Sequence, residues 1–315
     1  FDLMTSYKNF FRTQKSGEKF TTKTLEKAKR RKRKLTSYDM KGHPKFKKKD
    51  RCKPSFAQPN EKLYFKNGCA ILLKIGHVEI QTDYELPQGR DVCKFYNPRV
   101  SYVNGKWILS FAMEVEKQDY ALKDCSVGVD LGIKDLAVVS CEGDKMVFPN
   151  INKTRKVKRL NRHLKHAQRL AARKTKGSKN RRKAYEKCKR LCERLASIRH
   201  DYTHKTTTKI ADLLPSRIVV EDLNVRGMMK NRHLARAVAE QNFYKFRAQL
   251  EYKCEERGIE LVVANRFFPS SKKCSACGAI HKGLKLKDRI FNCPHCGMSI
   301  DRDFNAALNL ENYVA

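Results

Sequence analysis

Residues 126–133 read SVGVDLGI, an apolar strand pattern that a single carboxylate, Asp130, interrupts. A second apolar run, residues 136–139 (LAVV), follows a tight turn and predicts a second strand. An acid in such a run needs a reason, because burying an unpaired charge costs free energy. The two runs therefore predict buried strands, the first of which carries an acid near its end.

Two later segments repeat the combination of an apolar element and an acid. Residues 217–223 (RIVVEDL) place Glu221 where a buried strand reaches the edge of its sheet. Residues 300–310 (IDRDFNAALNL) have apolar residues at helical spacing and predict a helix with acid in its first turn. Of the two acids there, Asp301 is favoured as the helix cap and competes with Asp303 for a role in a site.

Any one of these acids alone is readily explained as a cap or a surface residue. Three acids, each at the end of an apolar element and spread over about 170 residues of sequence, can nevertheless converge in space. Hard divalent cations prefer carboxylate oxygens, and two metal ions about 3.5 to 4 Å apart can clamp the attacking water and the leaving oxygen of a phosphodiester. The pattern is therefore compatible with a pair of catalytic Mg²⁺ ions.

Four cysteines form the strongest local signal in the chain. Residues 274–278 (CSACG) and 293–297 (CPHCG) give the spacing C-x₂-C-x₁₅-C-x₂-C. Two tight turns that each present two thiolates predict a closed tetrahedral Zn²⁺ site, which is structural because no ligand position stays open. The expected ligands are Cys274, Cys277, Cys293 and Cys296, with His295 exposed inside its turn. The other eight cysteines form no comparable pair in the sequence.

Basic residues are concentrated in two blocks. The chain has 69 Lys and Arg against 33 Asp and Glu, a net charge of +36. Residues 1–53 hold 19 basic and 5 acidic residues, and residues 151–200 hold 20 and 2, so the blocks carry +14 and +18. This excess excludes an ordinary small-molecule enzyme surface and predicts a polyanionic partner, for which we favour nucleic acid. A disordered basic tail or a localisation signal is the alternative for the first block.

Both blocks supply candidate phosphate contacts. In residues 151–200, apolar residues at helical spacing on either side of Gly177 and Ser178 predict an antiparallel helical pair with one apolar seam and a basic opposite face. The nucleic-acid contacts that we expect are Lys29, Arg30, Arg31, Lys32, Arg33, Lys47, Lys48, Lys49, Arg155, Lys158, Arg159, Arg162, Arg181 and Arg182.

The segment between the basic blocks has the sequence pattern of strands joined by turns. Residues 61–120 contain apolar runs separated by turn residues, and Asn104-Gly105 is a typical hairpin signal. We expect a small β-barrel or meander with no catalytic grouping.

The segments around the acids also carry a family resemblance. They resemble the split RuvC nuclease motifs of TnpB, the RNA-guided endonuclease that bacterial transposons encode. The matching segments are residues 127–134 (VGVDLGIK), 218–228 (IVVEDLNVRGM), 268–272 (FPSSK) and 301–307 (DRDFNAA). Compact type V CRISPR effectors are relatives of TnpB. The resemblance covers residues 121–315 in order, with the zinc ribbon in the expected place. Over residues 1–120 it rests on the basic helix and on residues 44–47 before a β-rich segment.

The resemblance implies an α/β, RNase H-like fold with two catalytic Mg²⁺ ions and one structural Zn²⁺. Asp130 would lie on the first strand, Glu221 at the end of the fourth, and Asp303 on the last helix. The implied domains are a basic helical segment at the end of a recognition lobe (1–42), a β-rich wedge domain (43–120) and a RuvC-like nuclease domain (121–315) with a basic helical insertion (155–213) and a zinc ribbon (270–300). The implied partners are a guide RNA and a double-stranded DNA target with a displaced single strand.

Three other functions are compatible with the same residues. A compact type V CRISPR effector would use a guide from a CRISPR array. A regulator would bind DNA through a guide without cleaving it, although the intact acids count against this reading. A nuclease of the resolvase type would need no guide.

The start of the chain and its lack of long apolar runs give expectations about its completeness and its location. Phe1 in place of Met indicates that the numbering begins inside a longer chain, so the family's first wedge strand and most of its recognition helices should precede it. No apolar run approaches the roughly 18 residues of a membrane span, and the first 30 residues have no secretory apolar core. We therefore expect no membrane partner, a location in the cytoplasm of a prokaryotic cell, and mostly reduced thiols. The oligomeric state stays open.

Overall fold

The computed structural model describes residues 2–15, 19–45, 52, 54–89, 92–103, 105–116, 118–285 and 288–314. Three of the predicted nucleic-acid contacts, Lys47, Lys48 and Lys49, lie outside these residues. The chain divides into two compact units, residues 1–114 and 115–315. No helix within the described residues is both long enough and apolar enough to cross a membrane.

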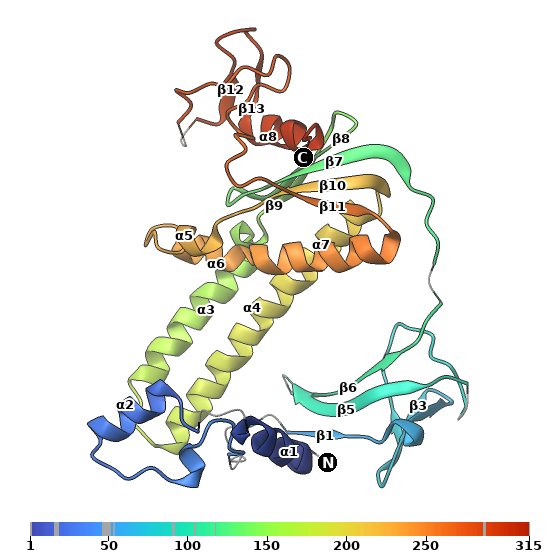
Figure 1. Ribbon diagram of the computed structural model, residues 1–315, viewed down its shortest axis with the longest axis vertical. Helices are drawn as coiled ribbons and strands as arrows, with labels where there is room; N and C mark the ends of the chain where they lie inside the picture. Colours follow the sequence, from blue (N-terminus) through green and yellow to red (C-terminus); the bar gives the residue numbers. More distant parts are fainter. Residues whose placement is uncertain are drawn as a thin grey trace. The chain divides into compact units, whose positions relative to one another are not determined.

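The first unit contains two helices and two three-stranded antiparallel sheets (Figure 1). The helices are α1 (Asp2–Gln14) and α2 (Thr22–Arg30), followed by the 3-10 turn η1 (Ser37–Asp39). One sheet has the order β1-β5-β6 (Ser55–Ala57, Phe95–Val103, Lys106–Met113), and the other has the order β2-β3-β4 (Tyr64–Lys66, Cys69–Leu72, Gly76–Glu79). The predicted hairpin between residues 103 and 106 is confirmed, because Val103 pairs with Lys106.

Aromatic residues from both small sheets form one core in the first unit. Phe65 of β2, Phe95 of β5 and Phe111 of β6 have ring centroids 5.1 to 5.5 Å apart. Phe65 is 1% exposed, and the cluster also includes Leu63 and Leu72. The structure thus has two small sheets with a shared core, where one barrel or one meander was expected.

The second unit is built on a five-stranded mixed sheet with the order β11-β10-β7-β8-β9 (Figure 1). Strands β7, β8 and β9 pair antiparallel, while β10 pairs parallel with β7 and β11 pairs parallel with β10. The strands are β7 (Lys123–Leu131), β8 (Asp135–Cys141), β9 (Asp144–Pro149), β10 (Pro215–Glu221) and β11 (Glu260–Ala264). The second strand predicted at residues 136–139 is therefore confirmed.

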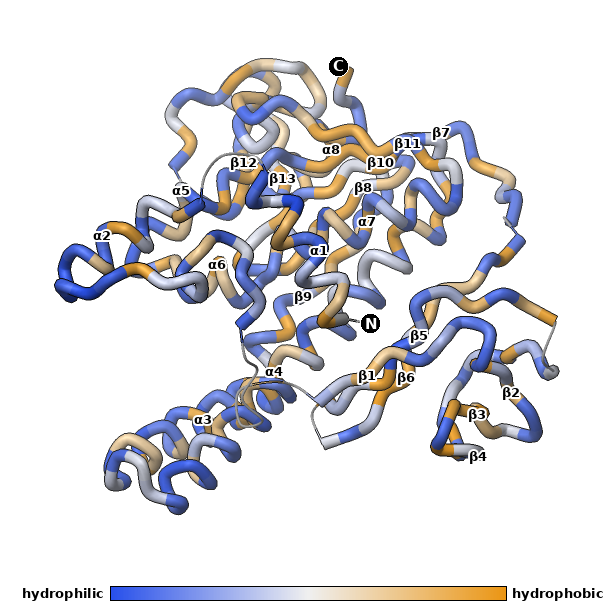
Figure 2. Tube along the Cα trace, turned by 60° about the horizontal axis from the view of Figure 1, so that its bottom comes forward, coloured by the Kyte–Doolittle hydropathy of each residue, from blue (hydrophilic) through white to orange (hydrophobic). Residues whose placement is uncertain are grey.

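Helices cover both faces of this sheet. α7 (Phe243–Arg257) and the end of α4 (Lys179–Ala211) pack on one face, where Val127, Val129 and Val220 join the apolar cluster of the core. α8 (Arg302–Glu311) packs on the other face against β7, β8 and β10. Figure 2 shows the strands and α8 as the most apolar part of this unit. Two short helices, α5 (Val225–Met228) and α6 (Ala235–Gln241), connect β10 to α7.

The predicted helical pair extends from the sheet as α3 (Arg155–Ala172) and α4, after the 3-10 turn η4 (Ile151–Lys153) (Figure 1). Val157, Leu160 and Leu195 form part of the apolar seam between them, as the spacing predicted. Leu170 also has the helical spacing from which we predicted the seam, but it is 40% exposed and so departs from that prediction. Figure 2 shows this pair as mainly hydrophilic outside the seam.

The α/β fold that the resemblance implies is confirmed in its arrangement of elements. β7, the first strand of the sheet, carries Asp130, the fourth strand, β10, ends at Glu221, and the last helix, α8, carries Asp303. A two-stranded ribbon, β12 (Ile290–Asn292) and β13 (Ser299–Asp301), leads directly into α8.

Candidate active site

Asp130 and Glu221 lie side by side near the ends of two parallel strands. β7 and β10 pair with Val129 opposite Val220, so the two acids are the next residues on their strands. Side chains alternate between the faces of a sheet, and Val129 and Val220 point into the core under α7. The two carboxylates therefore point to the face that α8 covers.

α8 approaches β7 closely because residue 128 is a glycine. A Cβ atom on Gly128 would lie 2.0 Å from the carbonyl oxygen of Ala307 and 2.3 Å from the amide nitrogen of Glu311. Only a residue without a side chain allows two backbones to come this close. Since Gly128 and Asp130 share one face of the strand, this contact brings the helix that carries Asp303 onto the side of the sheet that Asp130 faces.

The three carboxylates lie close enough for Asp303 to perturb both Asp130 and Glu221. Burial raises the pKa of Asp130 well above its usual value, and the negative charges of Glu221 and Asp303 raise it further. Burial also raises the pKa of Glu221, an effect that Asp303 strengthens and a hydrogen bond from Ser270 Oγ to Glu221 Oε1 opposes. Like charges that share a partly buried site in this way favour a cation among them.

Neighbouring side chains hold two of the acids. Arg302 binds Asp303, with Arg302 Nη2 2.9 Å from Asp303 Oδ1, and Ser270 binds Glu221. Within the described residues, the ligand atoms of the three acids are not among the groups that gather within 4.8 Å of one another. The structure thus brings the predicted acids to one place without forming a tight cage.

Asp301 has a structural role, as predicted. Its Oδ1 accepts a hydrogen bond of 3.0 Å from the amide of Phe304 and so caps α8. Burial opposes ionisation of Asp301, but the Phe304 amide and the charges of Lys145 and Lys134 outweigh this and lower its pKa. The carboxylate lies 3.4 Å from Lys145 Nζ and 3.9 Å from Lys134 Nζ.

The four predicted zinc-ligand cysteines form one cluster. Their sulfur atoms all lie within 4.8 Å of one another, with 3.7 Å between Cys274 and Cys296 and 3.6 Å between Cys277 and Cys293. A tetrahedral site with Zn–S bonds of about 2.3 Å requires sulfurs roughly 3.8 Å apart. The cluster is therefore compatible with zinc. His295 is exposed, as expected.

Each cysteine pair lies on a tight backbone turn. The amide of Gly278 donates to the carbonyl of Cys274 (2.9 Å), and the amide of Gly297 donates to the carbonyl of Cys293 (3.1 Å). Both glycines have φ near +74°, the left-handed region that glycine adopts without strain. The two CxxCG segments thus form matching turns.

Two buried asparagines, which no sequence motif above singled out, tie the cysteine cluster to α8. Asn305 accepts a hydrogen bond from the amide of Ser275 (3.0 Å) and donates to the carbonyl of Lys273 (2.7 Å). Asn309 donates to the carbonyls of Ser270 (2.8 Å) and Lys273 (2.7 Å). A sequence signal existed, because two asparagines four residues apart share one helix face in the otherwise apolar stretch of residues 304–310. The backbone around Cys274 is thereby fixed to the helix that carries Asp303.

The structure also forms a second group of ligand side chains that the sequence did not reveal. Cys125, Cys141 and Glu142 gather within 4.8 Å. Burial and the neighbouring Cys125 raise the pKa of Cys141 to about 11. The other cysteines form no comparable pair along the sequence, as expected, but the neighbouring strands β7 and β8 bring Cys125 and Cys141 together in space.

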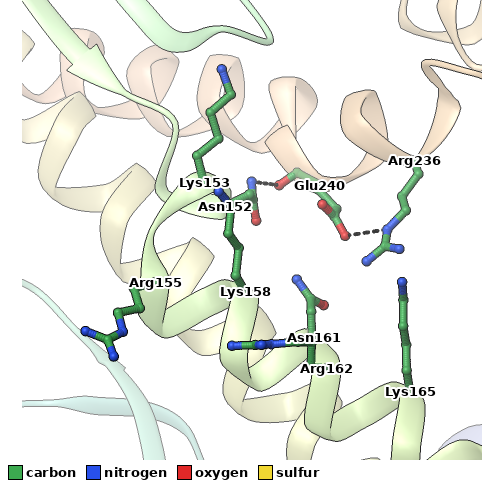
Figure 3. A pocket seen from close by; sticks show the side chains of 9 residues that line it. All are labelled: Asn152, Lys153, Arg155, Lys158, Asn161, Arg162, Lys165, Arg236 and Glu240. Atoms are coloured by element: carbon green, nitrogen blue, oxygen red, sulfur yellow. Dashed lines mark hydrogen bonds and ion pairs between the residues drawn. The ribbon is translucent and has the colours of Figure 1, made fainter.

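The basic face of α3 carries three predicted nucleic-acid contacts. Arg155, Lys158 and Arg162 line a pocket of about 740 Å³ between α3 and α6, together with Lys165 and Arg236 (Figure 3). The α3 residues follow a spacing of 3, 4 and 3, so they lie on one face of the helix. None of these four α3 residues forms an ion pair with any residue that the structure describes.

Glu240 is the one acid among the residues that line this pocket. It lies 3.0 Å from Arg236 (Figure 3) and 3.2 Å from Arg199, so both partners are basic. The pocket therefore keeps a large positive excess. Lys165, Arg236 and the neighbouring Lys153 are further basic residues of this pocket that were not among the predicted contacts, although Lys165 continues the α3 spacing.

The remaining predicted contacts differ in their surroundings. Arg159 and Arg182 are exposed, whereas Arg181 is half-buried, with its guanidinium 5.5 Å from the ring centre of Tyr185. In the first unit, the predicted contacts Lys29, Arg30, Arg31, Lys32 and Arg33 are all exposed, and exposed Lys34 continues the basic run. Arg33 is bound by Asp39 at 2.6 Å, which gives it a structural role there.

Comparisons with known proteins place the chain in a family. Residues 110–232 match the family model described as "Probable transposase", and residues 243–310 match the model described as "Cas12f1-like, TNB domain". A Streptomyces pristinaespiralis protein named "Putative RNA-guided DNA endonuclease" is 35% identical over 85% of this chain and 64% of its own length. InsQ of Escherichia coli, which has the same description, is 30% identical over 98% of this chain and 71% of its own.

The similarity does not extend over the whole of these relatives. The chain spans 64% of the Streptomyces protein and 44% of a Mycobacterium tuberculosis relative that is 34% identical. A solved CRISPR-Cas12f ternary complex is 16% identical, with a TM-score of 0.47, over 95% of this chain and 72% of that one. Proteins described as TnpB-like, from Acanthamoeba polyphaga mimivirus, are 26% identical over 65% of this chain. By its match to most of the length of InsQ, the chain belongs to the TnpB family.

Proposed function

We propose that this chain acts in an RNA-guided DNA endonuclease that hydrolyses phosphodiester bonds in DNA complementary to a bound RNA. The observation that carries the proposal is the convergence of Asp130, Glu221 and Asp303 from two strands and a helix onto one face of the sheet. Membership of the TnpB family supports the same reading, since relatives at 30% and 35% identity are described as RNA-guided DNA endonucleases.

Asp130, Glu221 and Asp303 would hold two Mg²⁺ ions. Burial and the neighbouring negative charges raise the pKa values of Asp130 and Glu221, and with Asp303 these carboxylates are a suitable donor set for hard divalent cations. When bound, such ions supply an activated water and stabilise the charge on the leaving oxygen. Ser270 would orient Glu221 through its hydrogen bond, and Arg302 would hold Asp303 in place.

Cys274, Cys277, Cys293 and Cys296 would bind one structural Zn²⁺. Four sulfur ligands leave no open position, so the metal would stabilise the fold and take no part in hydrolysis. Its effect would reach the acids through the hydrogen bonds of Asn305 and Asn309, which join the first cysteine turn to α8.

A guide RNA and the DNA target would bind the basic surfaces. Choice of sequence would come mainly from base pairing with the guide, while the protein would contact the backbone and a short flanking motif. The unpaired basic face of α3 is suited to phosphates, so binding should weaken steeply as salt rises. We also propose the wedge domain at residues 43–120 and the RuvC-like nuclease domain at 121–315 as the functional division.

The test begins with the full-length protein purified from cells that express its native locus. Co-purifying RNA is sequenced, and the complex is incubated with matching and non-matching DNA, with and without Mg²⁺. We expect a discrete RNA and Mg²⁺-dependent cleavage only at complementary sites. The origin of that RNA separates a transposon-derived guide from a CRISPR array.

Two matched acid variants test the site itself. Asp130→Asn and Asp303→Asn should abolish cleavage while guide-directed binding stays within a few fold, because these acids would hold metal and not the duplex. Asp301→Asn is the control, since asparagine caps a helix about as well as aspartate. Cleavage lost in Asp301→Asn but retained in Asp303→Asn would show that the wrong acid was assigned. Binding without cutting by the unaltered protein would indicate a regulator, and cutting without RNA a resolvase-type nuclease.

A further inference from the structure

A pocket of about 570 Å³ opens directly beside Glu221. Its apolar walls come from Leu131 at the end of β7, from Leu223 after β10, and from Phe243 at the start of α7. This volume lies within the range of about 300 to 1,000 Å³ that is typical of small-ligand sites. The pocket is thus large enough for a small organic group next to one of the three acids.

Three guanidinium groups line this pocket. Arg247 and Arg266 both bind the carboxylate of Asp222, the residue after Glu221, and the Arg247 contact is 3.4 Å. Arg226 forms no ion pair with any described residue. Asp222 therefore positions two of the guanidiniums and offsets one of the three positive charges. Glu221, which also lines the pocket, offsets at most one more, so the pocket keeps a positive charge suited to an anion.

Tyr244 is the most exposed aromatic residue among those that line the pocket. It is 80% exposed, whereas Phe243 beside it is 3% exposed in the core. An exposed ring gains little from packing within the protein. Aromatic rings next to basic groups are instead typical of sites where unpaired bases stack, because every base has a π-face.

We infer that this pocket binds one unpaired nucleotide of the DNA strand that is cut. Its base would stack on Tyr244, and its phosphate would bind Arg226, Arg247 and Arg266. The neighbouring phosphodiester would then lie beside Glu221. The inference rests on the proposed function, because a pocket at the acids receives the strand that those acids cut.

The first test compares Tyr244→Ala and Tyr244→Phe in the full-length protein with its guide RNA. Loss of one base stack should raise the DNA concentration for half-maximal cleavage about 5- to 150-fold in Tyr244→Ala. Tyr244→Phe keeps the ring and should stay within about twofold of the unaltered protein. Tyr252→Ala is the matched control, since Tyr252 lies on the same helix, is 45% exposed and is outside the pocket.

The second test measures stacking without cleavage. A DNA target with 2-aminopurine in the cut strand is bound by the guide complex without Mg²⁺, and its fluorescence is recorded. Quenching that disappears in Tyr244→Ala and persists in Tyr252→Ala supports the pocket. Equal quenching in both variants, or quenching only of 2-aminopurine placed in the guide RNA, would overturn it.

The two tests separate the pocket from the proposed function. If the unaltered complex cuts DNA and the Tyr244→Ala complex shows the same cleavage and the same quenching, the inferred nucleotide site is refuted and the nuclease assignment stands. If the unaltered complex never cuts but Tyr244-dependent quenching is present, the pocket stands as a nucleotide site and the nuclease assignment fails.

Discussion

Replacing Gly128 with alanine tests the close contact that places α8 on the sheet. The new methyl group would lie 2.0 Å from the carbonyl oxygen of Ala307, whereas Cβ atoms in proteins essentially never come closer than 3.0 Å. The neighbouring atoms belong to the backbone of α8, so no side chain can turn away. The helix must therefore move by about 1 Å relative to β7.

The size of this displacement sets the expected effects. Overpacking of this kind costs about 1 to 3 kcal/mol. For a unit of roughly 200 residues, each kcal/mol lowers the midpoint of thermal unfolding by about 2 to 4 °C, so we expect a fall of about 2 to 12 °C. Asp303 moves with α8, and a displacement of about 1 Å at a reacting centre can reduce a rate on the order of 10²-fold.

Thermal unfolding and the rate of guided DNA cleavage are measured for Gly128→Ala and for a control, Gly283→Ala. At Gly283 the added methyl group would lie 3.2 Å from Cε1 of His281, a side chain that can move by a few tenths of an ångström. The control should therefore change little in either assay. A Gly128→Ala protein that unfolds within about 1 °C of the unaltered protein and cuts within about twofold of its rate would refute the reasoning.

Three further predictions concern other parts of the chain. Cys274→Ser should lose both stoichiometric zinc and part of its cleavage rate, and full retention of zinc would contradict the cluster assignment. Phe65→Ala should destabilise the first unit by about 3 to 5 kcal/mol in denaturant unfolding, because Phe65 is 1% exposed and contacts two other rings. Burial lowers the pKa of Lys253 from 10.5 to about 8, so between these pH values the unfolded chain holds a proton that the folded chain has lost. Lys253 should therefore make the free energy of unfolding rise with pH across that window, and Lys253→Met should remove this rise. Equal pH slopes in the unaltered protein and in Lys253→Met would refute the prediction.

The sequence by itself determined the local features of this protein. Short apolar runs at residues 127–131 and 217–221 predicted strands that the structure contains, because strand formation depends mainly on residues that are neighbours along the chain. The CxxC spacing likewise predicted the cysteine cluster, since two tight turns are local structures. The cap role of Asp301 and the seam of α3 and α4 followed from the same short-range rules.

The tertiary structure decided which distant residues meet. Asp130 and Glu221 are neighbours only because β10 pairs parallel with β7 in one particular register, and a shift of one residue would turn Glu221 to the opposite face. Cys125 and Cys141 meet through strand pairing in the same way. The links of Asn305 and Asn309 and the pocket under Tyr244 depend on how α8 and α7 pack on the two faces of the sheet. Such contacts join segments far apart in sequence, and the spacing within each segment contains no information about the distance between them.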